Sequence, residues 1–276
     1  MNKDFDVEHL TPSIGSYIYG LDLSKPIEAD TLKKLRATWL QRKVLFFPDQ
    51  KLTPQQQLDF TEQFGVLDKY PFLDGMEDYP FIAEVLKLPE EKINFGGIWH
   101  TDTTYLEEPA LGASLYAIEL PKLGGDTLFA NMVSAYQALP DEIKQQIDGL
   151  KAVNTSSKAD VSKTRAIRFS GDISTMQVIT NTHPVVRTHP ETGEKILYVN
   201  EAHTLHFEGW SEEESQKLLN YLYKHSRKPE FQCRYKWTLG AVTLWDNRAT
   251  HHYPVNDYTG SRRLLHRVSI KGERPR

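Results

Sequence analysis

The sequence predicts a mostly β fold, an antiparallel sandwich with helices on its outside. Short runs of alternating apolar and polar residues, separated by turn residues, dominate the C-terminal half of the chain. Runs with helical spacing lie mostly upstream, which favours an α+β sandwich over a parallel α/β sheet. The chain has 276 residues, of which 39% are hydrophobic and 11% aromatic, so it can bury a substantial core. We therefore expect one domain over residues 1–276.

Helical signals flank the first expected strand. Apolar side chains recur at helical spacing over residues 28–43, and the apolar run 44–48 that follows predicts a strand. A second helix is marked by Thr53 as its N-cap, by Gln56 as the partner in a capping box, and by Gly65 at its end. Two later helices are expected, at residues 140–149 and 211–226.

The remaining strands are predicted in the C-terminal half. Residues 183–189 and 196–200 flank the turn sequence 190–193, which predicts a hairpin. Residues 231–237 alternate large apolar and polar side chains, as a strand with one buried face does. Two more strands are expected, at residues 241–247 and 266–270.

Residues 150–182 show no sustained period and are rich in Ser, Thr, Asp and Lys. Segments of this length inside a compact domain are usually active-site lids or disordered insertions, and the sequence leaves both open. As a lid, the segment would bring Arg165 and Arg168 over a bound substrate and exclude water.

The composition excludes several classes of protein. The 37 acidic and 33 basic residues give a net charge of -4, without the basic excess typical of nucleic-acid binding, so we expect a small-molecule partner. Cys233 is the only cysteine, which excludes an intramolecular disulfide and fits a reducing compartment. We find neither an apolar leader nor a run of about 20 apolar residues, and we expect a cytoplasmic protein that does not contact membranes.

The strongest local signal is the run GGIWHTDTTY at residues 96–105. Its His100 and Asp102 are two residues apart and would project from the same face of an extended chain. An imidazole nitrogen and a carboxylate oxygen suit iron(II), and one further His would complete a facial triad that leaves three positions open. Taken alone, the pair has a second interpretation as a surface polar cluster, because His-x-Asp often arises by chance.

A second run, WDNRATHHYPVNDYTGSRRLLHR at residues 245–267, supplies the missing histidine. It resembles the C-terminal signature of the taurine/2,4-D dioxygenase (TauD/TfdA) family, in which the distal iron ligand directly precedes a tyrosine. This assigns His252 rather than His251 as the ligand. Arg263 and Arg267 stand eleven and fifteen residues after His252, as the two arginines of the family do. The resemblance covers nearly the whole chain and includes the runs GGDTLF and HPVVRTHP.

The resemblance implies a double-stranded β-helix (jelly-roll, cupin-like) fold and an Fe(II)- and 2-oxoglutarate-dependent dioxygenase. His100, Asp102 and His252 would form the catalytic iron centre, with O2 as the second co-substrate, and 2-oxoglutarate would be converted to succinate and CO2. The family anchors the far carboxylate of 2-oxoglutarate at positions that correspond to Arg263 and Thr127. A guanidinium suits this task because it forms two parallel charge-assisted hydrogen bonds with a carboxylate.

The arginines and the threonine also have structural alternatives. Arg263 follows Arg262, and such a pair is ordinarily a solvated charge run, while Thr127 would cap a turn. Arg267 is either an anchor for an anionic substrate or a partner in a structural ion pair. On a strand, Arg263 and Arg267 would share one face about 13 Å apart, so that one holds the co-substrate and the other the substrate.

The resemblance also assigns substrate-facing positions to Arg267, Tyr70, Leu73, Gly96 and Thr103. Relatives that bind taurine have His at the position of Tyr70 and Asn at the position of Gly96, and Leu73 replaces a tyrosine. Taurine is therefore not the expected substrate. We expect a small organic anion with a more apolar body, a sulfonate, sulfate ester or carboxylate, which loses a heteroatom leaving group where the hydroxylated carbon carries one.

Two other classes of function remain as alternatives, a non-oxidative jelly-roll metalloenzyme and a non-catalytic small-molecule-binding protein. The combination of Arg263 and Thr127 argues against the first, and the complete ligand set argues against the second. Members of the family commonly form dimers or higher assemblies, so the resemblance implies a homo-oligomer, a dimer or tetramer.

Overall fold

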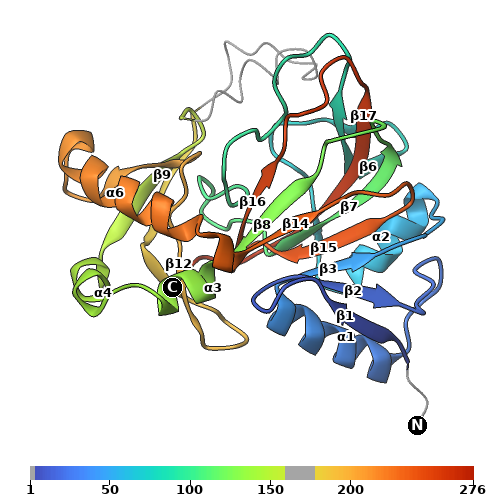
Figure 1. Ribbon diagram of the computed structural model, residues 1–276, viewed down its shortest axis with the longest axis horizontal. Helices are drawn as coiled ribbons and strands as arrows, with labels where there is room; N and C mark the ends of the chain where they lie inside the picture. Colours follow the sequence, from blue (N-terminus) through green and yellow to red (C-terminus); the bar gives the residue numbers. More distant parts are fainter. Residues whose placement is uncertain (1–3, 159–177) are drawn as a thin grey trace.

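The computed structural model describes residues 4–158 and 178–276, whose strands form four sheets; the two that make the sandwich are flanked by helices (Figure 1). The larger sheet has nine strands, and all its neighbouring pairs are antiparallel except β2 and β3. Its order is β1 (Asp6–His9), β2 (Ser16–Tyr19), β3 (Val44–Phe47), β15 (Val242–Asp246), β7 (Gly112–Glu119), β17 (Arg263–Ile270), β6 (Tyr79–Lys87) and β5 (Gly75–Met76), with β4 (Leu67–Asp68) paired to β17.

The smaller sheet carries one wall of the site. Its order is β14 (Gln232–Tyr235), β8 (Thr127–Asn131) and β16 (Thr250–Pro254). The core between the two sheets contains aromatic side chains from both, and the rings of Phe46 and Tyr235 stack with their centres 3.9 Å apart. Two sheets that pack face to face confirm the predicted sandwich and agree with the expected jelly roll.

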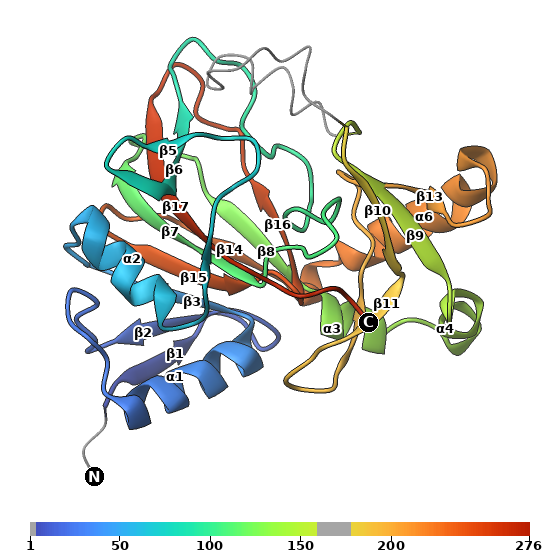
Figure 2. The same cartoon turned by 180° about the vertical axis from the view of Figure 1, so that it is seen from behind.

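Two helices cover the outer face of the larger sheet (Figures 1 and 2). They are α1 (Ala29–Arg42) and α2 (Pro54–Glu62), and both pack against side chains of β3 and β15 in one hydrophobic cluster. The predicted capping box of α2 is confirmed, since Thr53 accepts from the backbone of Gln56 and the Gln56 side chain accepts in return.

A side layer with its own apolar cluster lies next to the sandwich (Figures 1 and 2). It contains the predicted hairpin, in which Val186 pairs with Leu197. Its elements are α3 (Met132–Gln137), α4 (Asp141–Ile147), β9 (Lys151–Thr155), β10 (Thr180–Pro184), β11 (Val186–Thr188), β12 (Lys195–Leu197), β13 (Thr204–Phe207), α6 (Glu212–Ser226) and the 3-10 helix η2 (Pro229–Phe231).

The expected lid at residues 150–182 is described only at its two ends, which form β9 and β10 and pair with each other. Residues 159–177, and with them Arg165 and Arg168, lie outside the described residues. Within residues 4–158 and 178–276, no helix is long and apolar enough to cross a membrane.

Candidate metal and co-substrate site

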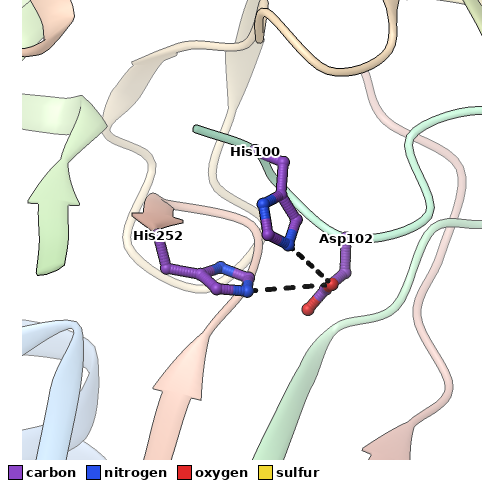
Figure 3. A group of neighbouring side chains, drawn as sticks. All are labelled: His100, Asp102 and His252. Carbon is purple, nitrogen blue, oxygen red and sulfur yellow. Dashed lines mark ion pairs between the residues drawn. The ribbon is translucent and has the colours of Figure 1, made fainter. Parts of the chain in front are cut away.

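The three predicted metal ligands meet where β16 runs beside the segment that precedes β7. The backbones of His100 and His252 exchange two hydrogen bonds, of 3.1 and 2.8 Å. Asp102 Oδ1 lies 3.6 Å from His100 Nε2 and 3.9 Å from His252 Nε2. Figure 3 shows both imidazole rings turned toward this carboxylate. One ligand atom from each residue can be chosen so that all lie within 4.8 Å of one another.

The sequence had suggested an extended chain through His100 and Asp102, and this prediction is wrong. Only His100 pairs with a strand, and Asp102 already lies in a turn that continues through Thr103, whose φ is 55°. The Asn247 side chain holds this turn through three hydrogen bonds. Its Oδ1 accepts from the Asp102 N–H (2.9 Å), and its Nδ2 donates to the carbonyls of Asp102 (3.1 Å) and Ala110 (2.9 Å).

The histidines present Nε2 to the metal position. His100 Nδ1 donates to the carbonyl of Ile98 over 2.7 Å, so Nε2 keeps its lone pair. His252 packs its ring against Phe129 and Trp245, with ring centres 6.0 and 5.2 Å away. Burial holds the pKa of His252 well below its usual value, which favours a neutral imidazole, the form that binds a metal.

The carboxylate of Asp102 is ionised despite its burial. Burial acts to raise the pKa of Asp102, but the adjacent Arg267 guanidinium outweighs it, and the pKa lies well below the usual value. Two neutral imidazoles and one carboxylate form the donor set of the facial triad that binds iron(II) and leaves further positions open. The residues present therefore fit the metal that the sequence implies.

Arg263 and Thr127 line the cavity beside the metal ligands. Arg263 is 4% exposed, and its Nε has no hydrogen-bond partner. Among the residues that the structure describes, no carboxylate lies within 4.0 Å of its guanidinium. Burial lowers the pKa of Arg263, and the neighbouring Tyr258 and the more distant Asp126 offset only part of this effect. The Trp237 indole donates to Thr127 Oγ1 over 3.0 Å, so the hydroxyl proton of Thr127 can be donated into the cavity.

The rest of the cavity wall is largely apolar. Val85, Leu115, Trp245 and Leu265 line it between the anchor residues and the metal position. An apolar wall excludes water and strengthens the interaction of any charged groups inside.

Arg267 forms an ion pair with one of the metal ligands. Its Nη2 is 2.9 Å from Asp102 Oδ2, and its Nη1 donates to Asp102 Oδ1 over 3.1 Å. The guanidinium carbon lies 4.7 Å from the centre of the Tyr70 ring, so these two expected substrate positions are brought together. The structural ion pair that the sequence left open for Arg267 is present, and it is formed with a metal ligand.

The other three expected substrate positions differ in where they lie. Gly96 contacts the metal centre, because a Cβ on it would come 2.8 Å from His100 Cε1. The Thr103 hydroxyl accepts from the Ala110 N–H over 2.9 Å, inside the turn. Of the five expected substrate positions, only Arg267 is among the described residues that line the cavity of Arg263.

Sequence reasoning missed Asn247 and Lys87. Asn247 is fully buried and lies in the run that supplied His252, so its place between the end of a strand and a metal ligand was an available signal. Lys87 lines the same cavity as Arg263, but only the pairing of β6 with β17 reveals this.

Comparisons with known proteins agree with this geometry. The family model described as "Taurine catabolism dioxygenase TauD, TfdA family" matches residues 6–269. An alkylsulfatase of Acinetobacter baylyi is 34% identical, over 98% of this chain and 86% of the relative. An alpha-ketoglutarate-dependent sulfate ester dioxygenase of Pseudomonas putida is 33% identical, over 99% of this chain and 91% of the relative.

A solved structure has the same fold. The crystal structure of a taurine dioxygenase from Burkholderia xenovorans superposes with a TM-score of 0.83 at 32% identity, covering 99% of this chain and 91% of that chain.

Proposed function

The chain belongs to the TauD/TfdA family of alpha-ketoglutarate (2-oxoglutarate)-dependent dioxygenases, and from this premise we propose that it hydroxylates small sulfate esters or sulfonates with an apolar body. The enzyme class is that of its relatives, and the metal triad it requires is present. The two alternatives drawn from the sequence, a non-oxidative metalloenzyme and a binding protein, are therefore set aside.

The observation that carries the co-substrate assignment is the unpaired charge of Arg263. A buried guanidinium without a carboxylate partner costs folding free energy unless an anion binds to it. In this proposal, the far carboxylate of 2-oxoglutarate is that anion. Arg263 binds it through two charge-assisted hydrogen bonds, and Thr127 donates its hydroxyl proton to the same group.

The remaining residues orient the reaction. His100, Asp102 and His252 hold iron(II), which when bound supplies the redox chemistry that couples O2 to the decarboxylation of 2-oxoglutarate. Ile98 fixes the ring of His100, and Asn247 fixes the turn of Asp102, so that the donor atoms keep their mutual positions.

The substrate assignment rests on Arg267, Tyr70 and Gly96. Arg267 is the cation nearest the metal ligands. One edge of its guanidinium faces Asp102, and in this proposal its remaining N–H groups bind the sulfate or sulfonate group. Tyr70 and Gly96 stand where taurine-binding relatives carry groups that hold taurine, so the pocket favours a less polar body.

The overall reaction is balanced with these participants. A sulfate ester R–CH2–O–SO3⁻, O2 and 2-oxoglutarate give R–CH(OH)–O–SO3⁻, succinate and CO2. The hydroxylated ester then loses sulfate and a proton and leaves an aldehyde, so no further oxidant is needed.

The test is succinate formation by iron(II)-loaded protein in the presence of alkyl sulfates, alkanesulfonates, aryloxyalkanoates, taurine and other carboxylates, with mass spectrometry of the products. We expect the strongest stimulation by alkyl sulfates or apolar sulfonates. Fastest turnover with taurine or with a cationic substrate would contradict the substrate assignment.

Two expectations from the sequence remain proposals of the same kind. We propose that residues 1–276 fold as a single domain and that the protein is a dimer or tetramer. Light scattering on the purified protein would test the oligomer, and a monomer at micromolar concentration would contradict it.

A further inference from the structure

A second buried cation lies opposite Arg263. In the antiparallel pairing of β6 with β17, Lys87 is the direct partner of Arg263, so both side chains leave the same face of the sheet. Each residue is 4% exposed, and both line the cavity that continues to the metal ligands. Two like charges directly opposite each other, both removed from water, destabilise a sheet unless something compensates them.

The described residues offer little compensation for Lys87. Its Nζ donates to Asn256 Oδ1 over 2.9 Å and lies 4.2 Å from the centre of the Tyr258 ring. No carboxylate lies within 4.0 Å of Nζ in the described part of the chain. Burial lowers the pKa of Lys87; the more distant charge of Glu91 opposes this effect and the charge of Arg263 adds to it, as expected for a cation without an anion in contact. An ammonium has three donors, and one hydrogen bond leaves two of them available.

A rigid contact keeps the two cations in place. The Tyr258 hydroxyl donates to Asn94 Oδ1 over 2.8 Å, and the Asn94 Nδ2 donates to the carbonyls of Pro254 and Val255 just after β16. The Tyr258 ring thus stays beside Lys87 Nζ and 5.9 Å from the guanidinium carbon of Arg263. Because neither cation can move easily to solvent, the cavity keeps a double positive charge ready for an anion.

We infer that Lys87 is a second cationic residue of the co-substrate site, which together with Arg263 binds the far carboxylate and selects 2-oxo acids that carry one. This inference rests on the proposed co-substrate role of Arg263 and extends it. Arg263 supplies the directional hydrogen bonds, and Lys87 supplies positive potential that a 2-oxo acid with an apolar tail cannot use.

The test compares two ligands on manganese(II)-loaded protein, in which no turnover occurs. N-oxalylglycine carries the far carboxylate, and 2-oxobutyrate does not. Their dissociation constants are measured by calorimetry for the wild type, Lys87→Met, Lys87→Arg and the exposed control Lys122→Gln. Lys87→Met removes one charge partner of the far carboxylate and should raise the dissociation constant of N-oxalylglycine about tenfold, while that of 2-oxobutyrate stays nearly unchanged. Lys87→Arg should largely restore the wild-type affinity for N-oxalylglycine.

The melting temperature of the same variants without ligand separates this role from a structural one. We expect Lys87→Met to be at least as stable as the wild type, because the substitution removes an uncompensated buried charge. Equal weakening of both ligands, unchanged binding of N-oxalylglycine, or a strongly destabilised Lys87→Met with no ligand selectivity would overturn the inference. Wild-type protein that binds neither ligand would instead overturn the proposed function, and the role of Lys87 with it.

Discussion

Buried charges occur in two regions of this molecule, and they are compensated in opposite ways. Against α1, the fully buried Asp246 accepts from Arg248 Nε and Nη2 and from His189 Nε2, over 2.8 to 2.9 Å. Arg248 also donates to Glu191, which in turn accepts from Arg36. Every charge in this network has an opposite charge in contact.

In the cavity, Arg263 and Lys87 are just as deeply buried but have no ion pair within 4.0 Å among the described residues. The two regions therefore have different roles. A paired buried network connects elements, here β15, the hairpin and α1. Unpaired buried cations instead form an anion site, in which the negative charge of the bound ligand compensates them.

The largest effect is expected from His252→Ala. This variant removes a ligand of the metal centre and should abolish iron-dependent succinate formation while the melting temperature of the metal-free protein stays close to that of the wild type. His206→Gln, a histidine outside the metal site, is the matched control. Retained activity in His252→Ala would show that the ligand is another residue.

Arg248→Met should produce the largest loss of stability. It leaves the Asp246 carboxylate buried without its main partner, which costs about 3–5 kcal/mol of the free energy of unfolding. Urea denaturation measures this loss, and the affinity of the folded protein for 2-oxoglutarate should not change. If Arg248→Met weakened the affinity for 2-oxoglutarate and left the free energy of unfolding unchanged, Arg248 would belong to the anion site and not to the structural network.

Arg263→Met should behave in the opposite way. Loss of the charged hydrogen bonds to the co-substrate, worth about 2–3 kcal/mol, should raise the KM for 2-oxoglutarate about 30- to 150-fold. The free energy of unfolding of the ligand-free protein should be unchanged or higher, because the removed charge had no partner. A loss of stability comparable to that of Arg248→Met would contradict the distinction between paired and unpaired charges.

Asn247→Ala should have a smaller effect, on the metal. Two of the hydrogen bonds that it removes hold the backbone of Asp102, and loss of such outer contacts lowers metal affinity about 10- to 100-fold. Metal titration of this variant is compared with that of Asn220→Ala, which changes an exposed asparagine. Unchanged metal affinity would reduce Asn247 to a purely structural role.

The smallest effect concerns pH. Burial opposes ionisation of Asp246, but Arg248 and His189 hold its pKa below the usual range, so this group stabilises the fold above its unfolded pKa of about 3.9. The stabilisation is lost as the pH falls toward the folded pKa. The free energy of unfolding should therefore decline below about pH 5, and the decline should be shallower in Arg248→Met than in the wild type. Equal slopes would contradict this account.

Local signals explain why so much of the fold could be predicted. Capping boxes lie within four consecutive residues, so the helices that begin after Thr53 and Ser211 could be located closely. The strand β7 was missed because its first six residues are all buried, which removes the alternation that marks a half-buried strand. The metal ligands were predicted because a family signature fixes their spacing.

The unpredicted part of the site depends on contacts between distant segments. The pairing of Lys87 with Arg263 follows from the register of β6 against β17, and the hold of Asn247 on Asp102 joins residues 145 positions apart. Neither contact leaves a pattern within one segment. The ion pair of Arg267 with Asp102 belongs to the same class, which is why the sequence left two roles open for that arginine.

The paired backbones of His100 and His252 join two segments that lie far apart in the sequence. Since the ligands come from segments roughly 150 residues apart, a bound metal acts as a cross-link that closes a very long loop of chain. Chelation of the metal should therefore loosen the closure of the whole sandwich, in addition to stopping catalysis. Metal supply thereby becomes a determinant of how long the folded protein survives proteolysis.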